Sequence, residues 1–404
     1  MRARRRSALG LIGSLVWIVV ALQAAPVYAV QAPPMPNVDT HGSEDVHTMD
    51  HFVPHLSTVP TPSGIHVGQV QLFVRERFQH AHRKRAVLMV QGANTSTVPV
   101  FDLPFAEYSW MDFLARSGFD VFAMDLTGYG GSTRPMMDDP CNTTTSDQQK
   151  LLMPNPLSDV CKPNYPFRLT SIQSDWDDID AVVDFIRDLR DVETVSLIGW
   201  SRGGPRAGGY AARHPEKVDR LVLYAPVYKR TTLSDPPPPG TLPQAGVPMT
   251  VFDPWTFPGW DAMVKCANQF DPDIRSVISS AQLQFDALGS TWGTRGVIRT
   301  PIQNTNPATT PPPGGLWGWN PEFAARVEAP TLIIRGDLDT LAPAADAQSL
   351  FEDLGSESKV SITVPCASHF MVWENQHMVL LEASRDWLRH GAFKGRSNGA
   401  FAVD

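Results

Sequence analysis

The sequence has little cysteine, little positive charge and, beyond its first 29 residues, no long apolar run. Four of its 404 residues are cysteine, and their spacing does not match a zinc site. No later stretch is apolar enough to span a bilayer, so we expect no stable membrane insertion of the mature chain. The chain carries 34 Lys and Arg against 42 Asp and Glu. This acidic balance argues against nucleic acid or an anionic membrane as a partner.

The first 29 residues have the composition of a secretory signal peptide. Four arginines within the first six residues precede an apolar stretch from Leu9 to Ala25, and Val27-Tyr28-Ala29 supplies a small-x-small cleavage site. Removing these arginines changes the formal net charge from −8 to −12. We therefore predict a secreted or periplasmic protein.

An even number of cysteines in an exported chain predicts disulfides, and four cysteines allow three connectivities. Cys141 and Cys161 bracket one polar insertion, residues 132–170, and are predicted to pair. That pairing leaves Cys266 to bond with Cys366.

The most specific motif is Gly199-Trp200-Ser201-Arg202-Gly203. It follows the apolar run 194–198 and precedes the small residues 203–209, which predicts a sharp turn between a strand and a helix. Glycines at both ends let the backbone turn tightly. We expect Ser201 to be exposed at the apex as a nucleophile, with the backbone N–H of Arg202 placed to stabilise an oxyanion.

A serine nucleophile needs a base, and the base needs an orienting acid. Downstream, one apolar strand-like run leads into a turn with Asp337 and Asp339, and the next leads into a loop with His369. The order Ser, Asp, His is the one expected after such a strand–turn–helix motif. His377 is the nearest other histidine, but it falls in the pattern of the last predicted helix.

Together these residues resemble the α/β-hydrolase superfamily, in the branch that carries a lid. The resemblance covers roughly residues 60–392. Members commonly show Gly-x-x-Asp-x-x-x-Pro after the seventh strand, which residues 336–343 match. The match assigns the acid to Asp339 and leaves Asp337 as a turn residue.

The resemblance implies an α/β fold with a doubly wound, mostly parallel sheet and a large lid domain inserted after strand six. It implies that no cofactor or metal is needed. The implied catalytic triad consists of Ser201, Asp339 and His369.

A second oxyanion donor is expected on the loop after the strand at residues 85–90. Family members often carry His-Gly-x there, with x donating its N–H. This chain has Gln91-Gly92-Ala93, so the resemblance assigns the donor to Ala93. The side chain of Arg202 has two open interpretations, a salt bridge within the fold or a contact to a substrate carboxylate.

Strands alternating with amphipathic segments, such as the helix predicted at 175–189, predict a mostly parallel sheet. The hundred residues between strands six and seven are too long for a plain connection, which predicts the lid. We divide the chain into a signal peptide (1–29), an extended N-terminal arm (30–60), the first part of the core (61–226, with the insertion 132–170), the lid (227–328), the second part of the core (329–392) and a C-terminal tail (393–404).

Two residue groups have open interpretations. His47, His51 and His55 recur every four residues, which on a helix would make a metal site, but Pro54 and polar neighbours favour a loop. The lid tryptophans are either lid core or the lining of an acyl or aromatic pocket. These tryptophans are Trp255, Trp260, Trp292, Trp317 and Trp319.

We predict a secreted serine hydrolase that cleaves carboxylic esters of small molecules through an acyl-enzyme. A lipase or polyester hydrolase falls within this class. Amidase, aminopeptidase or lactonase activity on the same triad is the alternative, and a non-catalytic binding protein is a more distant one. An aminopeptidase would need acidic lid residues to bind an amine. The candidates are Asp253, Asp261, Asp271 and Asp273.

Overall fold

The computed structural model describes residues 46–79, 84–144, 146–233, 241–305 and 317–403. The predicted signal peptide and the first part of the predicted N-terminal arm lie outside these residues. Among the described helices, none combines the length and apolar character that crossing a membrane requires.

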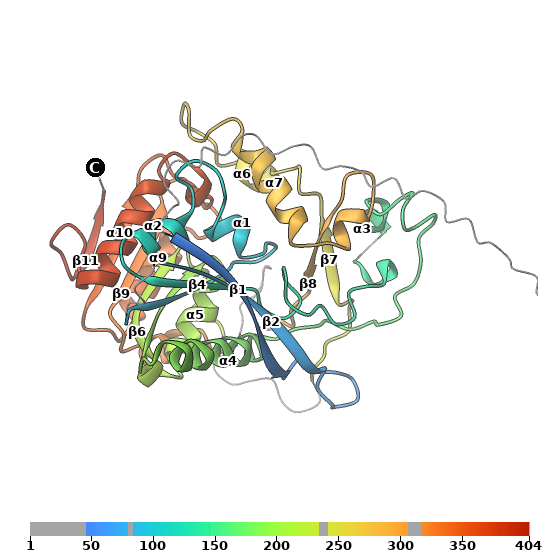
Figure 1. Cartoon of the computed structure of the whole chain (residues 1–404), viewed down its shortest axis with the longest axis horizontal. Coiled ribbons are helices and arrows are strands. Elements are labelled where there is room, and N and C mark those ends of the chain that lie inside the picture. Colours follow the sequence, from blue (N-terminus) through green and yellow to red (C-terminus); the bar gives the residue numbers. More distant parts are fainter. Residues whose placement is uncertain (1–45, 80–83, 145, 234–240, 306–316, 404) are drawn as a thin grey trace, which may run out of the picture. The chain divides into compact units, whose positions relative to one another are not determined.

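A nine-stranded sheet forms the core, in the order β1-β2-β4-β3-β5-β6-β9-β10-β11 (Figure 1). Strand β2 runs antiparallel to both β1 and β4, and all other neighbours are parallel. The predicted mostly parallel sheet is therefore confirmed. The strands are β1 (Val46–Ser57), β2 (Gly68–Gln79), β3 (Ala86–Val90), β4 (Asp120–Met124), β5 (Val195–Trp200), β6 (Val218–Tyr224), β9 (Thr331–Gly336), β10 (Lys359–Val364) and β11 (Gly399–Ala402).

Helices cover both faces of this sheet, as the doubly wound class requires. Helices α2 (Trp110–Arg116) and α10 (His377–His390) pack with one apolar cluster. Helices α4 (Ile172–Arg190), α5 (Gly203–Ala211) and α9 (Ala344–Asp353) pack with the other. The central strands are mainly apolar because side chains on each of their faces enter one of these two clusters.

Two helix starts follow directly from side-chain capping, which satisfies backbone N–H groups at the first turn. Ser109 accepts a hydrogen bond from the Asp112 N–H and begins α2. Ser171 and Ser174 form a reciprocal capping box at the start of α4. That box starts α4 earlier than the predicted helix at 175–189.

The predicted N-terminal arm and C-terminal tail are wrong in part, because both contribute strands to the sheet. Residues 46–57 form the edge strand β1 and pair with all of β2. Pro54 is compatible with this edge position. Exposed Met49, Phe52 and Leu56 alternate poorly with the inward-facing residues, which conceals the strand pattern in the sequence. At the other end, β11 pairs with β10 within the predicted tail.

The chain between β6 and β9 forms structure separate from the main sheet. It contains a two-stranded sheet of β7 (Met249–Phe252) and β8 (Ile298–Pro301). Its helices are α6 (Pro258–Asp261), α7 (Ile274–Gln284) and α8 (Pro321–Ala324). Two further short helices, α1 (Val98–Phe101) and α3 (Ser146–Lys150), precede α4. We call residues 227–328 the inserted segment.

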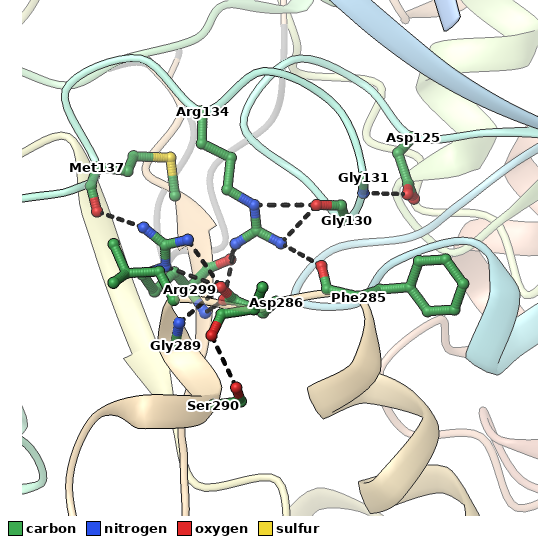
Figure 2. A network of polar contacts seen from close by, with 12 residues as sticks. Asp125, Gly130, Gly131, Arg134, Met137, Phe285, Asp286, Gly289, Ser290 and Arg299 are labelled. Atoms are coloured by element: carbon green, nitrogen blue, oxygen red, sulfur yellow. Dashed lines mark hydrogen bonds and ion pairs between the residues drawn. The ribbon is translucent and has the colours of Figure 1, made fainter. Parts of the chain in front are cut away.

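A buried ion-pair network fastens the inserted segment to the core, and Figure 2 shows it. The Asp286 carboxylate accepts from Arg299 Nε at 2.9 Å and from Arg134 Nη1 at 2.7 Å. Arg134, which follows β4 in the core, also donates to the Gly130 and Phe285 carbonyls at 2.9 Å each. One carboxylate thus joins an arginine of the core to an arginine of β8.

Both predicted disulfides are present. Cys141 bonds to Cys161 with a Cα–Cα distance of 5.4 Å, and Cys266 bonds to Cys366 at 5.9 Å. The second bond connects the inserted segment to the loop after β10. The inserted segment is therefore attached to the core covalently as well as through Asp286.

Candidate active site

Ser201 lies at a sharp turn between β5 and α5. Its φ is +55°, a left-handed conformation that is uncommon for a residue other than glycine. The turn depends on flanking glycines: a Cβ on Gly199 would lie 2.2 Å from the Gly203 carbonyl oxygen, and a Cβ on Gly203 would lie 2.4 Å from the Val90 carbonyl oxygen. Only glycine permits this close approach of strand and helix, so the sequence pattern dictates the turn that carries Ser201.

Asp339 and His369 come together from the loops after β9 and β10. His369 Nδ1 donates to Asp339 Oδ2 at 2.9 Å, and both side chains are buried. The other carboxylate oxygen, Oδ1, accepts from the N–H groups of Leu341 and Ala342 at 2.9 and 2.8 Å. These bonds fix the carboxylate against the ring and hold the proton on Nδ1, which leaves Nε2 as the basic nitrogen.

Backbone contacts fix the position of the histidine as well. The His369 carbonyl accepts from Trp200 Nε1 at 3.1 Å and from the Tyr224 hydroxyl at 2.8 Å. Trp200 directly precedes Ser201, so one hydrogen bond joins the turn that carries the serine to the loop that carries the histidine.

The competing residues lie elsewhere. Asp337 is exposed, and its carboxylate accepts only a long 3.4 Å bond from the Ala367 N–H among the described residues. His377 begins α10, stacks on Tyr108 at 3.9 Å between ring centroids and donates to the Glu374 carbonyl. Neither Asp337 nor His377 lines the cavity onto which Ser201 and His369 open.

Ser201 and His369 open onto one cavity of about 830 Å³. The walls come from the core and from the inserted segment, so the cavity lies between them. Most of its large side chains are aromatic, which provides an apolar surface for a substrate. The aromatic residues that line it are Tyr129, Trp200, Phe252, Phe257, Trp260, Phe370 and Trp373.

Four of the five tryptophans of the inserted segment divide between the two predicted roles, whereas Trp255 donates from Nε1 to the Arg295 carbonyl at 3.2 Å and lines neither a buried cluster nor the cavity. Trp260 lines the cavity and donates from Nε1 to the buried Glu374 at 2.8 Å. Trp292, Trp317 and Trp319 are buried in the apolar clusters. Packing therefore accounts for most of them, and one forms part of the cavity wall.

Ala93 and Arg202, the expected oxyanion donors, both line the cavity beside Ser201. The loop that carries Ala93 is held by Gln91, whose amide donates to the Met124 carbonyl at 2.6 Å and accepts from the Leu126 N–H at 3.2 Å. Gln91 therefore bonds this loop to the end of β4 and the residues that follow it.

Arg206 is a functional candidate that the sequence analysis missed. It is fully buried and donates from Nη1 to the carbonyls of Gln91 and Gly92 at 2.9 and 2.8 Å. Asp175 accepts from Arg206 Nε at 2.7 Å. Its position in the first turn of α5, five residues after Ser201, was the available signal, because helical side chains point back toward the helix start.

Two other residues near the candidate site carry no motif in the sequence. Buried Glu374 accepts from the Ser368 N–H at 2.8 Å and from Gln269 Nε2 at 2.9 Å, which links the histidine loop to the inserted segment. Gln303 lines the cavity and donates to Asp175 at 2.7 Å. Both are brought to the site by tertiary packing alone.

The histidines of the predicted arm do not lie on a helix. His51 contacts Glu76 at 2.8 Å and His55 lies 3.5 Å from Asp178, both from strand β1. No group of His, Cys, Asp or Glu in the described part of the chain is arranged to hold a metal ion. The loop favoured for His47, His51 and His55 and the helical arrangement considered beside it are both wrong, because these residues lie in strand β1.

The family model for the alpha/beta hydrolase fold matches residues 85–376. The chain therefore belongs to the alpha/beta hydrolase family. A comparison with curated proteins finds no match.

Solved structures with a similar fold include a meta-cleavage product hydrolase from Pseudomonas fluorescens IP01, at 16% identity over 84% of this chain and 98% of that one, with a TM-score of 0.50. An esterase from Thermogutta terrifontis is 17% identical over 84% and 98% of the two chains, with a TM-score of 0.46. An esterase from Exiguobacterium antarcticum is 14% identical over 84% and 100%, also at 0.46. At these identities the likeness concerns the fold alone.

Proposed function

We propose that this protein is an exported serine hydrolase that cleaves carboxylic esters of small molecules. The observation that carries the proposal is that Ser201, in its left-handed turn, and His369, bonded to Asp339, open onto one aromatic cavity. The signal-like first 29 residues and the two disulfides support export.

In the proposed reaction, Ser201 Oγ attacks the ester carbonyl carbon while His369 Nε2 takes its proton. The backbone N–H groups of Ala93 and Arg202 stabilise the oxyanion of the tetrahedral intermediate. The intermediate collapses with loss of the alcohol, which receives the proton from His369. Water, deprotonated by His369, then attacks the acyl-serine, releases the carboxylic acid and restores the serine hydroxyl. Asp339 stabilises the charged imidazole in both halves.

An amine-binding site receives less support from the cavity. Of the four acidic candidates for an aminopeptidase, Asp253 alone lines the described cavity, and Arg295 forms an ion pair with it at 2.6 Å. Asp261 pairs with Arg275 away from the cavity. The cavity therefore favours an ester without a free amine.

The direct test is hydrolysis of p-nitrophenyl esters from acetate to palmitate by the mature chain and by Ser201→Ala. Each methylene buried in the aromatic cavity is expected to add up to about 0.8 kcal/mol, or roughly fourfold in kcat/KM. Ser201→Ala is expected to lower kcat by at least about 10⁴-fold. Equal rates in the mutant would refute the serine mechanism. Turnover of aminoacyl p-nitroanilides but of no ester would instead establish an amidase.

A further inference from the structure

Two arginines line the cavity beside Ser201. Arg202 directly follows the serine, and its Nη1 donates to Gln303 Oε1 at 3.3 Å. Arg168 reaches the cavity from the end of the 132–170 insertion. Its Nη1 donates to the Gln303 carbonyl at 3.4 Å and to Thr305 Oγ1 at 2.8 Å. Two like charges thus converge on one neutral residue.

Neither arginine forms an ion pair with a carboxylate in the part of the chain that the structure describes. The single acidic residue of the cavity lining, Asp253, is already paired with Arg295. The other arginines near the cavity differ, since Arg206 pairs with Asp175 and Arg299 with Asp286. Residues 306–316, which follow Thr305, contain no Asp or Glu.

The surroundings hold Arg202 as a half-buried charge with a neutral hydrogen-bond partner. Gln303 donates its Nε2 to Asp175 at 2.7 Å, which turns its Oε1 toward Arg202. Asp175 forms its ion pair with Arg206 and not with Arg202, although its charge still acts on Arg202 from a distance. Burial, together with the like charge of Arg206, lowers the pKa of Arg202. An anion in the cavity would offset the free-energy cost of removing the Arg202 charge from water.

We propose that Arg168 and Arg202 bind a carboxylate of the substrate, so that the preferred substrate is an ester that also carries a free carboxylate, such as the half-ester of a dicarboxylic acid. Guanidinium groups suit this ligand because their planar array of donors matches a carboxylate. The aromatic walls hold the apolar part of such a molecule, and Ser201 attacks its ester carbonyl. This inference rests on the proposed ester hydrolysis and specifies its substrate.

The test compares ethyl hydrogen adipate with ethyl 6-methylheptanoate, in which an isopropyl group replaces the carboxylate at the same chain length. Ethanol release gives kcat/KM for both, and the selectivity is the ratio of the two values. We expect the wild type to prefer the half-ester at least tenfold, the scale of one hydrogen bond to a charged group. Arg168→Gln and Arg202→Gln should each reduce this ratio by about tenfold or more.

Arg168→Lys keeps the charge and should retain part of the preference, which separates charge recognition from damage to the fold. Arg326→Gln is the matched control, because Arg326 lies outside the cavity lining and pairs with the exposed Glu322. It removes one positive charge and should leave the ratio unchanged.

The outcomes separate the two proposals. Hydrolysis of both esters with a ratio near one would overturn the carboxylate site while ester hydrolysis stands. Hydrolysis of neither would overturn the esterase, and calorimetry would then decide the carboxylate site by measuring binding of ethyl hydrogen adipate to Ser201→Ala. Binding that weakens at least tenfold in Ser201→Ala/Arg168→Gln would support it, and absence of binding to Ser201→Ala would overturn it.

Discussion

At the scale of single residues, the candidate site depends on side chains whose contacts leave little freedom. One carboxylate oxygen of Asp339 accepts hydrogen bonds from two backbone N–H groups, and the other accepts from His369. The ring is therefore held in one tautomer before any substrate binds. Such preorganisation is what allows a weak hydroxyl nucleophile to react at neutral pH.

Asp339→Asn is expected to lower kcat by about 10⁴-fold, because the amide can favour the wrong imidazole tautomer. KM for a p-nitrophenyl ester should change far less, since Asp339 does not line the cavity. The exposed Asp337→Asn serves as the control and should keep the wild-type kcat. Loss of kcat in Asp337→Asn alone would reverse the assignment of the acid.

A second residue-scale prediction concerns pH. Burial raises the pKa of Asp178 from 3.8 to about 8, despite hydrogen bonds from Thr127, and the charges of Asp175 and Asp177 act in the same direction. The folded chain then keeps a proton that the unfolded chain loses, so the free energy of unfolding falls as pH rises from about 4 to about 8. Asp178→Asn should remove this part of the slope.

Urea unfolding at pH 5 and pH 8 measures the effect. The wild type should lose more free energy of unfolding between these values than Asp178→Asn does. Asp188→Asn, an exposed substitution on the same helix, should retain the wild-type slope. Parallel pH curves for wild type and Asp178→Asn would contradict the prediction.

At the scale of elements, the loop after β10 is held from two directions. Glu374 accepts from Ser368 within the loop and from Trp260 and Gln269 of the inserted segment. The Cys266–Cys366 bond joins the same two parts. The position of His369 is therefore coupled to the inserted segment, which also forms the cavity wall.

Removing Cys266–Cys366 with a double serine substitution should cost more stability than removing Cys141–Cys161. In the chain-entropy model the bridges contribute about 5 and about 3 kcal/mol, because the first closes a loop of 100 residues and the second one of 20. Thermal unfolding measures the difference. At a temperature where both variants are folded, esterase activity should fall only in the variant that lacks Cys266–Cys366. Equal activity in both would mean that His369 does not depend on this bond.

At the scale of the whole molecule, the cavity exists because the inserted segment is fixed against the core. Asp286 lies between buried Arg134 and Arg299 and also accepts from the Arg299 N–H and the Gly289 N–H (Figure 2). Strand β8 carries Arg299 and pairs with β7, and both strands supply residues that line the cavity. Breaking the network should affect stability and the cavity together.

Asp286→Asn removes the carboxylate partner of buried Arg134 and leaves Arg299 only the exposed Asp138, and it is expected to cost about 3–5 kcal/mol in stability. Denaturant unfolding gives the value, and kcat/KM for long-chain esters should fall with it. Asp147→Asn breaks an exposed pair with Lys150 and should leave the unfolding curve unchanged. A cost for Asp286→Asn as small as that of this control would show that the pair network does not hold the inserted segment.

The sequence by itself determined the parallel core, the turn at Ser201 and both disulfides. These features rest on local rules: apolar runs that predict buried strands, glycines required by close approach, and cysteines too few to pair in many ways. The sequence predicted the edge strands of the sheet poorly, because β1 and β11 are held by pairing with neighbouring strands rather than by an apolar pattern of their own.

Only the tertiary structure decided which side chains surround the serine. Gln303, Glu374 and Arg168 reach the site from distant parts of the chain, and nothing in their local sequence marks them. Arg206 lies close to Ser201 in the sequence, but only the fold shows that it binds the Gln91 and Gly92 carbonyls. The structure also places the Arg202 side chain against Gln303, so the salt bridge considered for it is not formed among the described residues. The physical reason is that local sequence fixes backbone conformation, whereas the pairing of charges depends on which elements pack together.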